Sequence, residues 1–154
     1  TVGAELAAGA TVAVLCEGDP LLFGTFIYLL HRLPDDAPVE VVPGIPSAIA
    51  AAAAECRPLT MGGEGFAVLP ATMGTDGLRA ALAAVASAAI LKTGKRFAAV
   101  RDLLTEMGLL DDARLIVELG SPNERRLPLA DWDEERAPYF SLILTRGLGA
   151  SDDG

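Results

Sequence analysis

The sequence predicts an α/β fold of two lobes, and three observations lead to this prediction. Short apolar runs without alternation, such as residues 11–16, are typical of strands that a parallel sheet buries on both faces. Segments with apolar residues at helical spacing separate these runs along the 154-residue chain. A connector containing Gly62, Gly63 and Gly65 interrupts the alternation, which predicts a boundary between the lobes.

The first lobe is predicted to comprise residues 1–61. Asp19 is a suitable helix cap and Pro20 a suitable first helical residue, and apolar residues then recur on one face as far as Leu33. The predicted elements are helices at residues 2–10, 20–33 and 47–54 and strands at residues 11–16 and 39–42.

The second lobe is predicted at residues 62–147, followed by a flexible polar tail at residues 148–154. We expect its last two strands to run antiparallel to their neighbours, with Tyr139 and Phe140 as core aromatics. The predicted elements are strands at residues 66–69, 89–92, 114–119, 125–127 and 139–146 and helices at residues 76–87 and 97–107.

Composition favours a packed protein and argues against two classes of partner. Apolar residues make up 51% of the chain and charged residues 21%, which is the balance of a folded domain. The formal net charge of −9 repels phosphate backbones and anionic lipid, so we expect no nucleic-acid and no membrane partner. Every apolar run also ends well short of the roughly 20 residues that a membrane span needs.

Cysteine usage and the N-terminal pattern predict a cytoplasmic protein. Cys16 and Cys56 lack CxxC spacing, which fits a reducing compartment, and we expect two free, mostly buried thiols. No basic segment followed by an apolar core and a cleavage site begins at Thr1. The single histidine, His31, is expected at the surface near a helix end, and we expect no metal site.

Two turns follow predicted strands and open predicted helices, which is where ligands bind in open α/β sheets. In EGDP, residues 17–20, the glycine lets a ligand approach the backbone and the carboxylates accept hydrogen bonds. In PGIPS, residues 43–47, the serine caps the helix or reaches a ligand. A tight turn with a helix cap would explain either motif alone. Together they predict that Asp19 and Ser47 line one crevice.

Positive charge is scarce, and part of it gathers after the strand predicted at residues 89–92. Lys92, Lys95 and Arg96 flank Gly94; they either hold an anionic substrate or solubilise a loop, and the second alternative is favoured. The sequence contains no Walker loop, no complete GxGxxG and no Ser-His-Asp set, so it identifies no catalytic residue.

Three stretches taken together resemble the tetrapyrrole methylase family. They are CEGDPLLFGTFIYLLHRL from Cys16, VVPGIPSAIAAAA from Val41 and PYFSLILTR from Pro138. The motifs GDP and PGIxS resemble motifs shared across that family. The longer motifs CEGDPLxFGT and YFSLIL resemble those of the branch that methylates C20 of precorrin-2. The resemblance runs from about residue 9 to residue 146 and is thin over residues 74–88.

The resemblance implies a class III methyltransferase fold, a homodimer and a cleft between two α/β lobes that binds S-adenosylmethionine. It implies methyl transfer to C20 of precorrin-2, or of its cobalt-loaded counterpart, in cobalamin biosynthesis, with S-adenosylhomocysteine as the product. Such a transfer relies largely on positioning, so the lack of a catalytic triad is no objection. Lys92, Lys95, Arg96 or Arg101 would offset the acidic surface towards a polycarboxylate tetrapyrrole. The implied cofactor-binding residues are Glu17, Gly18, Asp19, Leu22, Pro46, Ser47, Lys92 and Gly120.

The chain departs from the family pattern at its start. Members begin with a strand and a GxGPG-type loop that nothing before Thr1 supplies, so the resemblance implies a truncated first lobe. We then expect the strand at residues 11–16 to present unpaired edges or apolar surface. Two alternatives stay open: methylation of RNA or protein, as in other members of the superfamily, and a catalytically silent dimerising or ligand-binding module. The net charge argues against RNA.

Overall fold

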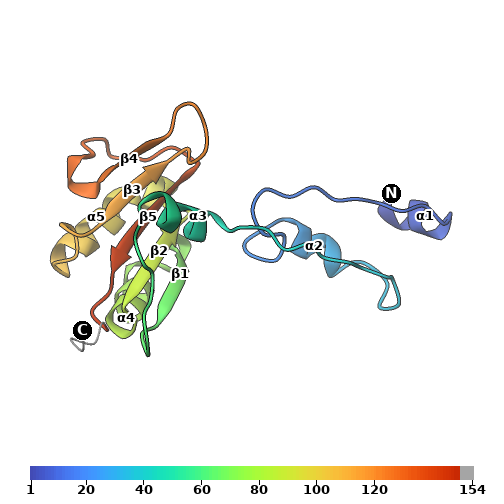
Figure 1. Cartoon of the computed structure of the whole chain (residues 1–154), viewed down its shortest axis with the longest axis horizontal. Helices are drawn as coiled ribbons and strands as arrows, with labels where there is room; N and C mark the ends of the chain where they lie inside the picture. The colour runs from blue at the N-terminus through green and yellow to red at the C-terminus, as the bar shows by residue number, and fades with distance from the viewer. Residues whose placement is uncertain (150–154) are drawn as a thin grey trace. The chain divides into compact units, whose positions relative to one another are not determined.

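The structure, a computed structural model, describes residues 1–149 and divides the chain into two compact units, Thr1–Pro46 and Ser47–Gly154. The second unit confirms the predicted α/β class, because its helices pack on a mixed sheet (Figure 1). The lobe limits expected from the sequence stay predictions.

The sheet of the second unit has five strands in the order β1-β2-β5-β3-β4. β1 (Phe66–Pro70) and β2 (Ser87–Leu91) are parallel. β5 (Ser141–Arg146) lies antiparallel between β2 and β3 (Arg114–Val117), and β4 (Arg125–Pro128) pairs antiparallel with β3. The antiparallel orientation predicted for the last two strands is therefore confirmed.

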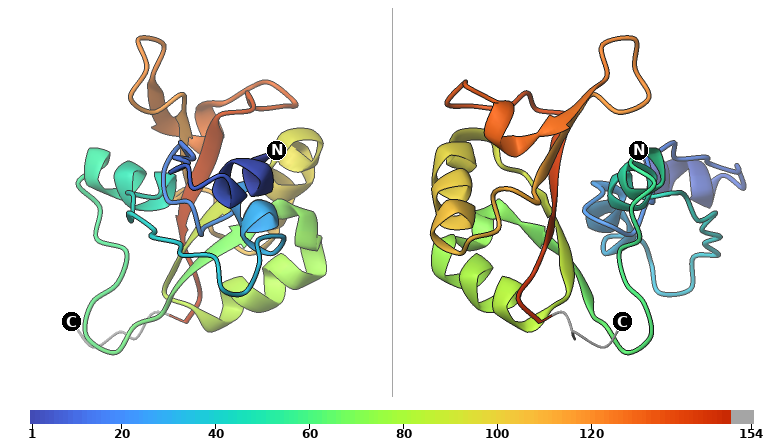
Figure 2. Two further views of the ribbon diagram at one scale, coloured as in Figure 1. Left: turned by 90° about the vertical axis from the view of Figure 1, so that its right-hand side faces the viewer. Right: turned by 60° about the vertical axis from the view of Figure 1, so that its left-hand side comes forward.

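Two amphipathic helices cover one face of this sheet (Figure 2). α4 (Thr75–Ala84) and α5 (Phe97–Glu106) bury leucines, a valine and Phe97 against alternate residues of the strands. α3 (Ser47–Ala54) packs its alanines on strand residues of the opposite face. The helix predicted at residues 76–87 is too long, because its last residue is already the first of β2. The short 3-10 helices are η1 (Ala71–Met73), η2 (Gly94–Arg96) and η3 (Leu129–Asp131).

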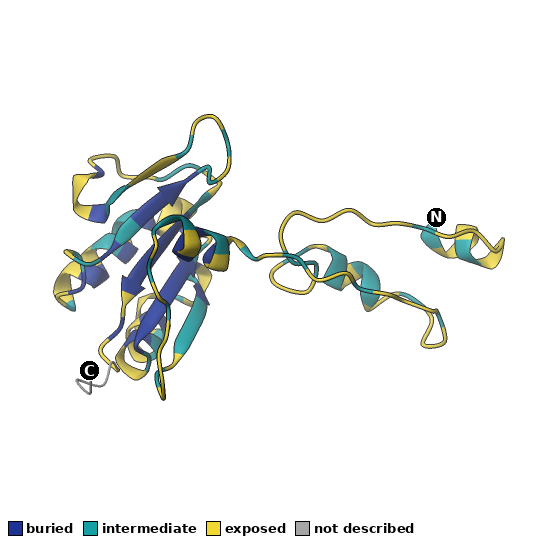
Figure 3. Ribbon diagram, viewed as in Figure 1, coloured by how far each residue is buried: buried dark blue, intermediate teal, exposed yellow. Residues whose placement is uncertain are grey.

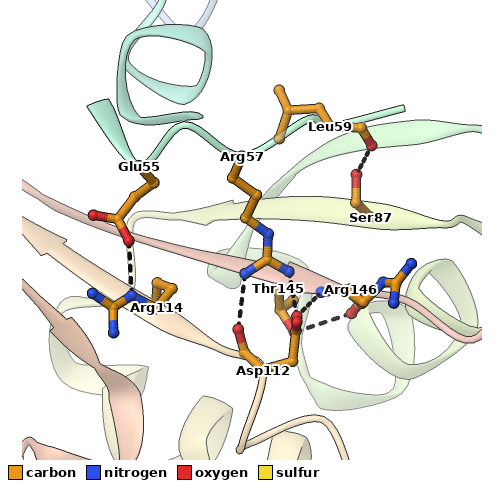
Figure 4. A network of polar contacts seen from close by, with 8 residues as sticks. All are labelled: Glu55, Arg57, Leu59, Ser87, Asp112, Arg114, Thr145 and Arg146. Atoms are coloured by element: carbon orange, nitrogen blue, oxygen red, sulfur yellow. Dashed lines mark hydrogen bonds and ion pairs between the residues drawn. The ribbon is translucent and has the colours of Figure 1, made fainter. Parts of the chain in front are cut away.

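Ionic contacts fasten the segment that follows α3 onto the sheet (Figure 4). Arg114 Nε donates a hydrogen bond to the Glu55 carboxylate at 2.8 Å. Arg57 forms an ion pair with Asp112 and also donates to its backbone carbonyl at 2.8 Å. The Asp112 carboxylate accepts a further hydrogen bond from the Arg146 amide at 2.7 Å. These contacts add to the packing of the α3 alanines, which bury only a small apolar area on the sheet.

The first unit contains two short helices and, within residues 1–46, no strand. α1 (Val2–Ala7) confirms the predicted opening helix, whereas α2 (Phe26–Leu30) is all that forms of the helix predicted at residues 20–33. Phe23 has a φ of 55°, in the left-handed region, which interrupts the helical path before α2. None of these 46 residues is buried (Figure 3).

The strands predicted at residues 11–16 and 39–42 are wrong, since neither segment has strand structure. A strand is stabilised by ladder hydrogen bonds to a neighbour, and residues 1–46 form no ladder. Leu15 is 95% exposed, which shows how little the first segment buries. Apolar composition predicted these strands, but composition does not supply a pairing partner.

Burial differs from expectation at two pairs of residues. Cys16 and Cys56 are free thiols, as expected, but both are exposed, because Cys16 lies in the unpaired first-unit segment and Cys56 in a left-handed turn after α3. Tyr139 and Phe140 are 90% and 60% exposed, because both precede the first residue of β5. His31 is confirmed as an exposed helix-end residue, the C-cap of α2.

The chain turns back towards α4 after β5. The amides of Gly147 and Leu148 donate to the carbonyls of Ala86 and Leu82, both at 2.8 Å, so the beginning of the polar tail is held in place. Residues 150–154 of that predicted tail lie outside the described residues. No helix within residues 1–149 is long and apolar enough to cross a bilayer.

Candidate functional site

The Asp19 carboxylate joins the two turns that the sequence marks as ligand-binding. Its Oδ1 accepts a hydrogen bond from the Leu21 amide at 2.9 Å, and its Oδ2 accepts one from the Gly44 amide at 3.1 Å. The first bond closes a local turn of the Asx type, and the second spans 25 positions of sequence. Asp19 is therefore a clamp between the GDP and PGI turns rather than the cap of a long helix.

Two glycines bring the backbones of these turns into contact. A Cβ placed on Gly44 would lie 2.0 Å from the Gly18 carbonyl oxygen, so any side chain there would force the turns apart. Gly18 itself has a φ of 70°, a conformation that favours glycine. The two turns thus pack backbone directly against backbone, which leaves no room for a side chain at position 44.

The other predicted residues of the first unit have fewer contacts. Glu17 is exposed, and Leu22 is 38% exposed with its amide donating to the Asp19 carbonyl at 3.3 Å. Gly18 and Pro20 line an apolar groove of about 490 Å³ within this unit. The groove offers apolar surface beside the GDP turn.

Pro46 and Ser47 lie on either side of the boundary between the two units. Pro46 is the last residue of the first unit and is half-buried, and the exposed Ser47 begins α3 in the second unit. Asp19 and Ser47 belong to different units, so the crevice expected between them stays a prediction.

The carboxyl ends of β2 and β3 lie at one edge of the second unit's sheet, because β5 begins beside the last residues of both. Lys92 and Glu118 directly follow those ends, and both adopt left-handed φ values, of 58° and 49°. Such a conformation costs a residue other than glycine about 1 kcal/mol or more. Two of the four non-glycine residues with left-handed φ values within residues 1–149 thus lie at the edge where α/β sheets bind ligands.

Thr93 adds an unpaired polar group at this edge. It is 2% exposed, and within residues 1–149 its Oγ1 has no hydrogen-bond partner. A buried hydroxyl without a partner destabilises a fold by about 1–3 kcal/mol. Buried polar groups are almost always hydrogen-bonded in folded proteins, so this hydroxyl is available to a bound ligand or water.

Gly120 follows β3 at the same edge with a φ of 79°. Its amide already has a partner, because it donates a hydrogen bond to the Glu124 carboxylate at 2.7 Å. As a glycine, residue 120 also has no side chain to cover the backbone there. Residue patterns did not single out Thr93 or Glu118, and they included Gly44 only as part of the PGIPS motif. Residue type alone does not predict a left-handed φ value or an unpaired hydroxyl, whereas a proline-glycine pair is typical of a turn and could have identified Gly44.

The four basic residues expected to offset the acidic surface divide into two groups. Lys92, Lys95 and Arg96 are exposed after β2, in or beside η2. Arg101 instead donates to the Trp132 carbonyl at 2.9 Å and lies 5.8 Å from the centre of the Phe97 ring, which fixes it structurally. Within the described part of the chain, no group of three His, Cys, Asp or Glu side chains is placed to hold a metal.

Comparison with known proteins gives consistent matches. A model of the tetrapyrrole (corrin/porphyrin) methylases matches residues 1–131. A precorrin-2 C(20)-methyltransferase from a Sinorhizobium species is 42% identical over 147 residues, covering 95% of this chain and 60% of the relative. A cobalt-precorrin-2 C(20)-methyltransferase from Salmonella typhimurium is 36% identical over 144 residues, covering 92% and 60%. The chain thus spans about 60% of the length of these curated relatives.

A solved structure is similar as well. It is a uroporphyrin-III C-methyl transferase from Thermus thermophilus, complexed with S-adenyl homocysteine. The two proteins are 29% identical with a TM-score of 0.56, over 82% of this chain and 62% of the other.

Proposed function

Because the chain belongs to the tetrapyrrole methylase family, we propose that the protein transfers a methyl group from S-adenosylmethionine to C20 of precorrin-2, or of its cobalt-loaded form, in cobalamin biosynthesis. The observation that carries this proposal is the 42% identity with a relative named for that activity. The sequence CEGDPLLFGT, which begins at Cys16, supports the same C20-methylating branch of the family. The tetrapyrrole is the small-molecule partner.

Two structural observations fit S-adenosylmethionine. Gly18 exposes backbone without a side chain at the GDP turn, and the Thr93 hydroxyl is buried with no hydrogen-bond partner among residues 1–149. When bound, this cofactor supplies a methyl group on a sulfonium sulfur, which an electron-rich carbon displaces. The residues proposed to hold it are Glu17, Gly18, Asp19, Leu22, Pro46, Ser47, Lys92 and Gly120.

The chain's own residues have positioning and electrostatic roles in this proposal. Asp19 holds the GDP and PGI turns together by accepting hydrogen bonds from the Leu21 and Gly44 amides, which fixes the positions of both turns relative to a ligand that binds beside them. Lys92, Lys95 and Arg96 supply local positive charge to a polycarboxylate substrate on a protein of net charge −9. A homodimer and a cytoplasmic location complete the proposal, supported by the family resemblance and by the cysteine usage.

The direct test is incubation of the chain, without oxygen, with S-adenosylmethionine carrying a carbon-13 methyl group and with precorrin-2 or cobalt-precorrin-2. We expect NMR to show the label on C20. The variant Gly44→Ala should lose transfer, because its Cβ would meet the Gly18 carbonyl. Gly63→Ala is the matched control, since a Cβ at Gly63 meets nothing within 4 Å. Label on another carbon, or cofactor binding without transfer to either macrocycle, would refute the proposal.

A further inference from the structure

We propose that Tyr139 and Phe140 form an aromatic platform on which the flat ring system of the tetrapyrrole stacks. This inference rests on the proposed function and names residues that bind its substrate. The two rings are 90% and 60% exposed, and they form an edge-to-face pair with centroids 5.0 Å apart and planes at 84°. Together they offer a ring face and a ring edge to a ligand.

The exposure of these rings contrasts with the strand that they precede. Leu142, Ile143 and Leu144 of β5 are at most 4% exposed, so the strand's apolar residues are used in packing. The two largest apolar side chains of the same stretch are left in solvent. Leaving two adjacent aromatic rings in water forgoes burial worth about 25 cal/mol for each Å² of apolar surface. Two adjacent exposed aromatic rings form an apolar surface that a ligand can cover.

Hydrogen bonds hold the backbone beneath the platform. The Phe140 carbonyl accepts a hydrogen bond from the Glu118 amide at 2.7 Å, and Ser141 Oγ donates to the Pro138 carbonyl at 2.7 Å. The backbone that carries the two rings is therefore ordered before a ligand arrives, which reduces the entropic cost of binding.

The position of the platform agrees with this role. Tyr139 and Phe140 lead into β5 at the sheet edge where Lys92, Thr93 and Glu118 follow β2 and β3. That edge combines aromatic rings with the positive charge of residues 92–96. A conjugated macrocycle with carboxylates around its rim matches both features. The adenine ring of a cofactor matches only the rings.

The test uses the intact chain and uroporphyrin, a stable, flat tetrapyrrole that carries several carboxylates, as the probe. Porphyrin absorption and fluorescence report its binding, and calorimetry with S-adenosylhomocysteine reports cofactor binding separately. In the double variant Tyr139→Ala and Phe140→Ala, we expect the Kd for uroporphyrin to rise about tenfold or more, the size expected for loss of aromatic stacking. The double variant Tyr139→Phe and Phe140→Tyr should retain most of the affinity.

Tyr28→Ala is the matched control, because Tyr28 is 68% exposed but belongs to the first unit. Thermal melting confirms that each variant folds. Failure of the wild-type chain to bind uroporphyrin, or equal affinity in the alanine variant, would refute the platform. A loss confined to S-adenosylhomocysteine would assign the rings to the cofactor instead and refute it as well. A platform-dependent uroporphyrin affinity without methyl transfer would support the platform while the proposed function fails.

Discussion

Replacing Asp19 by asparagine should open the contact between the GDP and PGI turns. The two carboxylate oxygens of Asp19 accept hydrogen bonds from two different amides, those of Leu21 and Gly44. Asparagine has one carbonyl oxygen, so its NH₂ group would face one of these two N–H donors. The longer-range bond to Gly44 is the one that we expect to break, since the bond to Leu21 closes a local turn.

The size of the effect follows from the charge and the exposure of Asp19. A hydrogen bond to a charged group contributes about 1.5–3 kcal/mol, and the lower part of that range applies where water can replace the lost partner. Asp19 is half-buried, so we expect the Gly44 contact to weaken by about 1–2 kcal/mol. Since 1.4 kcal/mol is a factor of ten, the Gly44 amide should exchange with solvent roughly ten times faster.

Hydrogen exchange followed by NMR measures this directly, amide by amide. Glu17→Gln is the matched control, because Glu17 is an exposed carboxylate two positions away whose side chain makes no hydrogen bond among the described residues. It should leave the exchange of Gly44 unchanged. Equal protection of Gly44 in the wild-type chain and in Asp19→Asn would show that the clamp does not hold the turns together.

Three further substitutions test other contacts. Thr93→Val should raise the free energy of unfolding by about 1 kcal/mol, because it removes a buried hydroxyl that has no partner among the described residues. The same variant should bind S-adenosylhomocysteine more weakly. Thermal melting and calorimetry measure the two effects, and a less stable variant with unchanged affinity would contradict this prediction. Arg57→Ala should lower the unfolding free energy by about 1–2 kcal/mol in urea titration, since it leaves Asp112 without its ion pair. Arg79→Ala should cost less than about 1 kcal/mol, because its partner Glu106 is exposed; an equal loss would refute this ranking.

The second unit could be predicted closely from residue patterns. Its helices carry apolar residues at helical spacing, and α5 ends within a residue of expectation, before the left-handed Gly108. In the first unit the same reasoning failed at residues 11–16. A strand forms only when a neighbouring strand pairs with it, and an apolar run in the sequence does not show whether such a neighbour exists.

The candidate site divides in the same way. The motifs around Asp19 could be found from residue types and from the family resemblance. The hydrogen bond from Gly44 to Asp19 could not, because it depends on how two distant turns fold against each other. Tyr139 and Phe140 illustrate the opposite error: aromatic composition predicted burial, but the strand begins just after them. Strand propensity predicts that an aromatic residue lies near a strand, but it does not predict whether the residue lies within the strand or just before it.

The placement of β5 has a consequence for how the protein is made. It is the last of the five strands to leave the ribosome, yet it occupies the centre of the sheet, between β2 and β3. Until residue 146 has emerged, β1-β2 and β3-β4 are two separate strand pairs, each with an unpaired apolar edge. Closure then joins strands distant in sequence, a topology that slows folding and keeps the unpaired edges open to aggregation until the last strand is in place.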